Sequence, residues 1–296
     1  MRRIERVCVI GLGLMGGSLA RALAARDVQV FGYDSVPDSL NAAEGEGIVH
    51  RRLGPSLDGI EEADVVVLAL PVDATIATLV RAAPLLANTR LVMDVASTKR
   101  TIVETAESAG LGAQYVGAHP LTGSHRSGWR ASRATLFDDA RVFLCPTRST
   151  KPESLALAES FWRGLRTGVE VLDAATHDEQ MAWRSHLPQV MSTALALVLH
   201  GAGIHRSALG PGGRDMTRLS GGSPELWTSI VEDNSVALGA ALDALDRELS
   251  RFRALLSQAD HARTNEYFAV GRDWFDGAPI AFDGAPIATT GRATAT

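Results

Sequence analysis

The sequence feature that most constrains the fold is a glycine-rich turn, Gly11-Leu12-Gly13-Leu14-Met15-Gly16, between two regular segments. An apolar strand pattern at 6–10 precedes the turn, and a helical pattern up to Arg26 follows it. A second strand pattern at 28–34 ends in an acidic residue, Asp34. A G-x-G-x-x-G turn in this strand–helix–strand context is the fingerprint of dinucleotide binding. The sequence therefore predicts an α/β Rossmann-type domain at the N-terminus.

Each part of the fingerprint has a physical role in this prediction. Gly11 permits a tight turn, Gly13 lets a pyrophosphate approach the backbone, and Gly16 allows the helix to pack closely on the strand. The helix N-terminus attracts the phosphates. Asp34 can accept hydrogen bonds from the adenosine ribose hydroxyls and would repel a 2′-phosphate, so the expected cofactor is NAD rather than NADP. The alternative is a glycine-rich turn that binds no ligand.

Strand and helix patterns alternate as far as Asp173, which predicts a parallel, doubly wound sheet. After Asp173 only helical patterns follow, and the longest, at 234–257, is amphipathic. The final stretch contains a tandem duplication and is rich in Ala, Thr and Gly. The expected organisation is a dinucleotide-binding domain at 1–173, an all-α C-terminal domain at 174–275 and a disordered tail at 276–296.

Composition excludes several classes of function. The net charge of −5 gives no basic surface for nucleic acid, and the apolar runs are too short to span a membrane. The N-terminus lacks the apolar segment and cleavage site of a signal peptide. The two cysteines, Cys8 and Cys145, lie in apolar strand patterns, as buried thiols of a reducing compartment do. We therefore expect a cytoplasmic protein with a small-molecule substrate and no metal site.

A second polar, glycine-containing stretch begins near residue 117 and carries His119. The strand pattern before it ends at Val116, so His119 is expected at the first polar position past the strand, where open α/β sheets place their chemistry. Pro120 biases His119 towards an extended conformation, in which a histidine can act as a base near neutral pH. The alternative is a strand-end histidine that bonds to a neighbour. Ser97, at another strand end, can cap the helix that follows, contact substrate, or do both.

The helical pattern at 174–200 contains Pro188, which predicts a kink. His186 and Gln189 lie beside it, where freed backbone groups can meet a polar ligand. The alternative is a helix bent around a domain interface, with His186 hydrogen-bonded locally.

Together these motifs resemble the prephenate/arogenate dehydrogenase family of tyrosine biosynthesis over about residues 4–275. The resemblance implies an N-terminal dinucleotide-binding domain and an all-α C-terminal domain through which the family forms homodimers. The segments that carry it are the glycine-rich turn through Ser18, Asp34, Ser97 with Thr98-Lys99, His119-Pro120 with Gly123 and Ser127-Gly128, His177-Asp178, Ser185-His186-Leu187-Pro188, 214–218 and Trp227.

The resemblance also assigns roles to residues. It implies that His119 accepts the 4-hydroxyl proton of prephenate, that Ser97 hydrogen-bonds at the same centre, and that NAD takes the hydride. Loss of CO2 then aromatises the ring. Arg218 would pair with a substrate carboxylate, with Ser124, His186, Gln189 and Trp227 around the substrate. The cofactor-binding residues it implies are Gly11, Gly13, Leu14, Met15, Gly16, Asp34, Leu70, Pro71 and Ser97.

Two positions depart from the family pattern. Gln189 stands where the family usually has histidine, and His125 stands where it often has glutamate. Both positions bear on the substrate side chain, so we expect prephenate as the substrate, with arogenate or 4-amino-4-deoxyprephenate as the alternative.

Two other functions fit part of the sequence. A β-hydroxyacid dehydrogenase or imine reductase shares the glycine-rich opening, but the hydroxyacid enzymes use a lysine after the dinucleotide domain, and this chain has none after Lys151. A non-catalytic NAD-binding protein would not need His119, Ser97 and Arg218 together.

Overall fold

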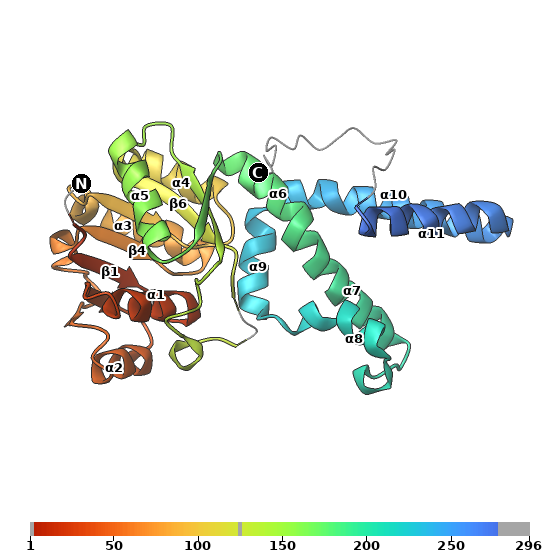
Figure 1. Ribbon diagram of the computed structural model, residues 1–296, viewed down its shortest axis with the longest axis horizontal. Coiled ribbons are helices and arrows are strands. Elements are labelled where there is room, and N and C mark those ends of the chain that lie inside the picture. Colours follow the sequence, from red (N-terminus) through yellow and green to blue (C-terminus); the bar gives the residue numbers. More distant parts are fainter. Residues whose placement is uncertain (1–2, 124–125, 278–296) are drawn as a thin grey trace. The chain divides into compact units, whose positions relative to one another are not determined.

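The computed structural model describes residues 3–123 and 126–277 (Figure 1). The chain forms two compact units, which meet between Gly239 and Ala240. Most of the expected tail, 278–296, lies outside the described residues, and Asp276 and Gly277 follow the last helix. Among the described helices, none has the length and apolar character that crossing a membrane requires.

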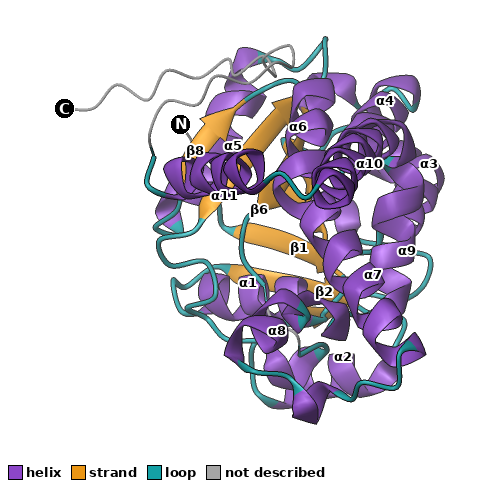
Figure 2. Cartoon of the chain, turned by 90° about the vertical axis from the view of Figure 1, so that its right-hand side faces the viewer, coloured by secondary structure: helices purple, strands orange, loops and turns teal. Residues whose placement is uncertain are grey.

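The first unit contains an eight-stranded sheet with the strand order β3-β2-β1-β4-β5-β6-β7-β8. Its strands lie side by side among the helices (Figure 2). The strands are β1 (Arg6–Ile10), β2 (Gln29–Tyr33), β3 (Arg51–Arg52), β4 (Val65–Leu68), β5 (Leu91–Asp94), β6 (Tyr115–Pro120), β7 (Arg141–Pro146) and β8 (Gly168–Val171).

The prediction of a wholly parallel sheet is wrong at one pair of strands. β6 and β7 are antiparallel, with His119 opposite Phe143, whereas the other neighbouring strands are parallel. A parallel neighbour needs a crossover connection, usually a helix. Between β6 and β7 the described chain forms only a short 3₁₀ turn, Trp129–Ala131, so the next strand returns antiparallel.

The predicted position of His119 past the end of its strand is also wrong. β6 continues through His119 and Pro120, because β7 pairs with it beyond the point where β5 ends. β5 pairs with β6 only as far as Gly117, so Pro120 lies where one edge of β6 has no ladder partner. A proline, which has no backbone N–H, is tolerated at such an edge.

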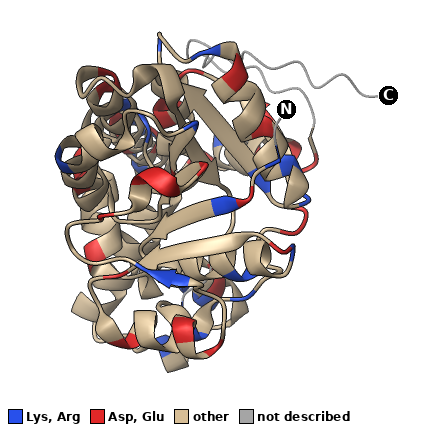
Figure 3. Ribbon diagram, turned by 90° about the vertical axis from the view of Figure 1, so that its left-hand side faces the viewer, with Lys and Arg blue, Asp and Glu red and all other residues tan. Residues whose placement is uncertain are grey.

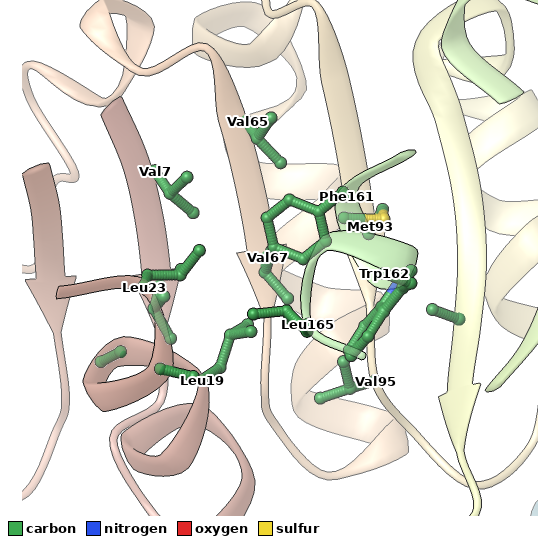
Figure 4. Packing of buried hydrophobic residues seen from close by; sticks show 14 of the residues in the cluster. Val7, Leu19, Leu23, Val65, Val67, Met93, Val95, Phe161, Trp162 and Leu165 are labelled. Atoms are coloured by element: carbon green, nitrogen blue, oxygen red, sulfur yellow. The ribbon is translucent and has the colours of Figure 1, made fainter. Parts of the chain in front are cut away.

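Side-chain alternation along the strands builds a core on each face of the sheet. Val7 and Val9 point to the face covered by α1 (Leu14–Ala24) and α5 (Pro152–Gly164). Val7 and Trp162, which packs on this face, are shown in Figure 4. Cys8 and Ile10 point to the opposite face, covered by α3 (Val72–Leu86) and α4 (Arg100–Ser108). Both cysteines are buried free thiols.

The helices of the first unit follow the predicted alternation, except that the sequence patterns did not predict α2 (Pro37–Gly45). They are α1 (Leu14–Ala24), α2 (Pro37–Gly45), α3 (Val72–Leu86), α4 (Arg100–Ser108), α5 (Pro152–Gly164), α6 (Ala174–Met181), α7 (Leu187–Gly201), α8 (Pro211–Met216) and α9 (Pro224–Asp233).

The helix predicted at 174–200 is interrupted by a π-helical turn, Ala182–His186, between α6 and α7. Pro188, in the first turn of α7, lacks an N–H, and its ring crowds the carbonyl of the preceding turn. The backbone therefore widens before the proline, and His186 ends the widened turn.

The second unit holds most of α10 (Ser235–Gln258) and all of α11 (His261–Phe275). Phe252 of α10 packs on Tyr267 and Phe268 of α11, with ring centroids 4.9 and 5.8 Å away. α11 lies beyond the last helical pattern in the sequence, at 234–257.

Acidic and basic residues are interspersed over the face shown in Figure 3, and the strands there are mostly uncharged. This face has no area of one sign of the kind that nucleic-acid binding requires.

Candidate active site

The glycine-rich turn is packed tightly at two positions and open at a third. Gly11 has φ +90°, and a Cβ on it would lie 2.4 Å from the Ala69 carbonyl oxygen. A Cβ on Gly16 would lie 1.8 Å from the carbonyl oxygen of Gly11, so the start of α1 must carry glycine there. Gly13 has no atom within 4 Å of its Cβ position. The turn thus leaves room for a phosphate at Gly13, beside the first N–H groups of α1.

Asp34 is fixed next to this turn. Its carboxylate accepts the backbone N–H of Leu12 at 2.5 Å and that of Val36 at 2.7 Å. Leu70 packs against Gly11 on the other side, and Pro71 is the N-cap of α3. These residues surround the carboxyl ends of β1, β2 and β4, where this class of sheet binds dinucleotides. The geometry fits the dinucleotide site that the sequence predicts, including Leu14 and Met15 in the first turn of α1.

The connection between β6 and β7 packs against α1. Trp129 donates through Nε1 to Glu46 at 2.8 Å, and Arg21 lies over its ring at 4.2 Å from the centroid. Arg21 also pairs with Glu46 and donates to Ser132. A Cβ on Gly17 would meet Trp129 at 2.9 Å, so this second glycine makes room for the connection.

His119 lies at the start of a row of three hydrogen-bonded side chains. Its Nδ1 is 2.8 Å from Nε2 of His177, and Nδ1 of His177 is 2.7 Å from Oδ1 of Asp178. Burial lowers the pKa of His119 well below its usual range, and the charges of His177, Lys99 and His186 lower it further. His119 is therefore neutral at pH 7, as a general base must be.

Asp178 also closes the N-terminus of α4. Its two carboxylate oxygens accept the backbone N–H groups of Lys99 and Arg100, each at 2.8 Å. Lys99 is the N-cap residue, and no side chain of α4 caps it. The predicted capping role of Ser97 is therefore wrong, because Asp178 takes that place. Ser97 is half-buried after β5, the strand that pairs with β6.

Lys99 is buried completely and pairs with Asp94 at the end of β5. The hydroxyl of Tyr115 donates to the same carboxylate at 2.5 Å, and the backbone N–H of Ala96 donates at 2.9 Å. A buried ion pair needs such additional hydrogen bonds to offset the loss of solvation. This group places a fixed positive charge near His119.

His186, the last residue of the π-helical turn, is buried. Its Nδ1 lies 3.1 Å from the amide nitrogen of Asn234, and its ring packs edge-on to Trp227. Asn234 also donates to the Asp178 carbonyl at 2.7 Å. Burial lowers the pKa of His186 to about 4. These contacts agree with the alternative in which His186 is hydrogen-bonded locally, so its predicted contact with substrate stays a prediction.

Gln189 supports the turn that carries Arg218. Its amide nitrogen donates to the carbonyl of Leu219 at 2.8 Å, which leaves its oxygen Oε1 as an acceptor. Arg218 begins the 3₁₀ turn Arg218–Gly221 and is exposed. Ser124, predicted to contact substrate, and His125 lie outside the described residues.

Sequence reasoning found His177 and Asp178 as part of a motif and gave them no role. It missed Asn234, Asp94 and Tyr115 as parts of the site. The sequence does contain a signal for the pair: His177 and Asp178 lie four and five residues after the N-cap aspartate, Asp173, so they fall inside the first turns of a helix and can point inwards.

Two family models match the chain in succession. Residues 19–171 match the nucleotide-binding domain of prephenate dehydrogenase, and residues 173–270 match its dimerization domain. The chain belongs to the prephenate dehydrogenase family. The family, the fold class and the assignment as a dehydrogenase of this family, with its nucleotide-binding domain, are thereby confirmed.

Relatives of this family resemble the chain over nearly its whole length. The cyclohexadienyl dehydrogenase of Zymomonas mobilis is 30% identical over 276 residues, which are 90% of this chain and 94% of the relative. A prephenate dehydrogenase from Aquifex aeolicus, solved with hydroxyphenyl propionate and NAD+, has a TM-score of 0.83 and 26% identity, covering 93% of this chain and 98% of its own. The arogenate dehydrogenase of Synechocystis has a TM-score of 0.79 and 29% identity, covering 92% and 99%.

Proposed function

We propose that this chain is an NAD-dependent prephenate dehydrogenase, which converts prephenate to 4-hydroxyphenylpyruvate with loss of CO2. The observation that carries the proposal is the setting of His119. It is neutral, its Nδ1 is engaged by His177, and its Nε2 remains for a substrate hydroxyl. The family membership and the relative solved with NAD+ support the cofactor.

Each residue of the site has a separate role in the reaction. NAD bound at the glycine-rich turn would supply the acceptor for the hydride of the ring carbon that carries the hydroxyl. His119 takes the hydroxyl proton as the carbonyl forms, and Ser97 hydrogen-bonds to the same oxygen. The ring carboxylate then leaves as CO2, the released electron pair aromatises the ring as a phenolate, and the phenolate oxygen takes a proton back from His119. Aromatisation drives the reaction. Arg218 pairs with a carboxylate of the substrate, for which its planar fork is suited.

The cofactor preference rests on Asp34. Its carboxylate is held at the end of β2 by two backbone N–H groups and can still accept from ribose hydroxyls through its remaining lone pairs. A 2′-phosphate at this place would face a negative charge, so NAD should be preferred over NADP.

The substrate side chain is less constrained, and arogenate is the second candidate. Prephenate ends in a keto acid, whereas arogenate ends in an amino acid with an ammonium group. The amide nitrogen of Gln189 donates one of its two N–H groups to Leu219, so the side chain keeps an acceptor oxygen and a second N–H. The oxygen can accept from an ammonium and the N–H can donate to a keto oxygen, so Gln189 relaxes the discrimination against arogenate.

We also propose that the chain acts as a homodimer and that its dinucleotide domain ends at residue 173. The match of residues 173–270 to a dimerization domain supports both.

Steady-state kinetics with prephenate, arogenate and 4-amino-4-deoxyprephenate, each with NAD and NADP, tests the proposal. Prephenate with NAD should give the highest kcat/KM, and Asp34→Ser should narrow the preference for NAD. Gln189→His should lower the arogenate-to-prephenate ratio of kcat/KM. A wild-type preference for NADP, or turnover of none of the three substrates, would contradict the proposal. An unchanged ratio in Gln189→His would remove only the role of Gln189.

A further inference from the structure

The buried pair His177–Asp178 joins the parts of the active site that come from the two family domains. Both residues belong to α6, in the region of the dimerization-domain match, whereas His119 and the start of α4 belong to the nucleotide-binding match. His177 is 0% exposed and Asp178 2% exposed. We infer that His177 and Asp178 are positioning residues that fix the tautomer of His119, leaving its Nε2 unprotonated and directed to substrate. This inference rests on the proposed role of His119 as the base.

The direction of each hydrogen bond follows from the charges. Burial acts to raise the pKa of Asp178, but the bonds from His177 and from the backbone of Lys99 and Arg100 outweigh it and hold the pKa below its ordinary value. Asp178 is therefore an ionised carboxylate at neutral pH and accepts only. Nδ1 of His177, 2.7 Å away, must then carry the proton and donate it.

The same reasoning determines which nitrogen carries the proton in His177 and then in His119. Burial lowers the pKa of His177 despite the opposing effect of Asp178, so His177 is neutral and has one N–H. With that N–H on Nδ1, its Nε2 has only a lone pair. Nδ1 of His119, 2.8 Å away, must therefore be the donor. Neutral His119 then has its proton on Nδ1, and its Nε2 is free to accept.

The position of Asp178 is determined by the backbone and not only by side chains. Its carboxylate is held by the first N–H groups of α4, and its own carbonyl accepts from Asn234. Neither of these contacts depends on the rotamer of a long side chain. The row Asp178–His177–His119 is thus preorganised before substrate arrives, which is what positioning for catalysis requires.

The row also changes what happens when His119 takes the hydroxyl proton. The O–H bond of substrate breaks, an N–H bond forms at Nε2, and His119 becomes an imidazolium. Its Nδ1–H then becomes a stronger donor to His177, whose Nδ1–H in turn strengthens its bond to Asp178. The negative charge of Asp178 stabilises the imidazolium through His177, as a buried aspartate does for the histidine of a serine protease.

Nitrogen-15 NMR of histidine-labelled full-length protein tests the tautomer without catalysis. We expect His119, assigned by the signals lost in His119→Asn, to show a protonated Nδ1 and an unprotonated Nε2. In Asp178→Asn the amide oxygen should keep the bonds to His177 and Lys99, because an NH2 group in that place would face the Lys99 N–H, so the tautomer should persist while the negative charge is lost. A wild-type His119 with its proton on Nε2 would overturn the inference.

Kinetics supply the second test, with kcat separated from KM. Asp178→Asn should lose about 10²–10⁴-fold in kcat with the KM for NAD unchanged, because the negative charge that stabilises the imidazolium of His119 is lost. His177→Gln keeps an acceptor for Nδ1–H and should retain more activity than His177→Leu. Asp173→Asn, which alters only the N-cap of α6, is the matched control and should keep wild-type kcat.

The outcomes separate the two proposals. If His119→Asn loses turnover while Asp178→Asn and His177→Leu keep it, the inference is wrong and the proposed function stands. If His119→Asn keeps turnover, the proposed role of His119 fails first. Should Asp178→Asn not fold, equal activity of His177→Gln and His177→Leu is the result that overturns the inference.

Discussion

At the scale of single residues, charge and hydrogen-bond direction decide what each polar group can do. Arg218 illustrates this, because its guanidinium is exposed and stands on a turn supported by Gln189 and Ser192. Arg214, four residues earlier, instead donates to the carbonyl of Ser207 at 3.3 Å. Of these two arginines, Arg218 is the better placed to bind a carboxylate.

Arg218→Gln should therefore raise the KM for prephenate, because a charged hydrogen bond is lost. Such a bond contributes roughly 1.5–3 kcal/mol, which corresponds to about a ten- to hundredfold change. The matched control is Arg214→Gln, measured in the same steady-state assay. If KM rises in Arg214→Gln and stays constant in Arg218→Gln, the assignment must be exchanged.

At the scale of elements, the sequence predicted those parts of the fold that depend on local pattern. The glycine-rich turn, the α1 helix and the ends of β1 and β2 follow from apolar periodicity and glycine spacing, whereas β5 ends at Asp94, three residues before the strand end predicted at Ser97. The reversal of β7 does not, because it depends on which strand edge is free when the chain returns. The extension of β6 through His119 has the same cause.

The candidate site was predicted in part for the same reason. His119, Asp34 and Gly13 lie in recognisable local motifs. The bonds from His177 to His119 and from Asp178 to Lys99 join segments that are distant in the sequence, and the Lys99–Asp94 pair is buried by packing. No local pattern specifies such contacts.

The contact between α1 and the β6–β7 connection gives a prediction about stability. In Gly17→Ala the new methyl group would lie 2.9 Å from Trp129, which Glu46 and Arg21 hold in place. Overpacking of this kind costs about 1–3 kcal/mol. Gly45→Ala, at the end of α2 with nothing within 4 Å of its Cβ position, is the control. Urea unfolding should show a lower free energy of unfolding for Gly17→Ala and no change for the control. Equal stability of both variants would mean that Trp129 moves freely.

At the scale of the whole molecule, three neutral histidines, the buried His177 and His186 and the half-buried His119, make folding sensitive to acid. The pKa values of His119, His177 and His186 are all lowered, first of all by burial. In the unfolded chain each would titrate near 6.5. The unfolded state therefore binds more protons below that pH, and the folded state loses stability as the pH falls.

His186 provides the clearest measure of this effect. Its folded pKa of about 4 implies that its contribution is complete above about pH 6.5 and is lost as the pH falls towards 4. His186→Gln should flatten the dependence of Tm on pH between these limits. His205→Gln, at an exposed position, should not. Parallel curves for His186→Gln and wild type would show that His186 is not protonated on unfolding.

The central claim is that His119 removes the hydroxyl proton while NAD takes the hydride. The most direct test compares NADH formation from prephenate by wild type and His119→Asn, with the Kd for NAD measured alongside. We predict an unchanged Kd and a loss of about 10²–10⁴-fold in turnover, the usual contribution of a positioned acid–base group. A His119→Asn variant with near-normal kcat would contradict the account.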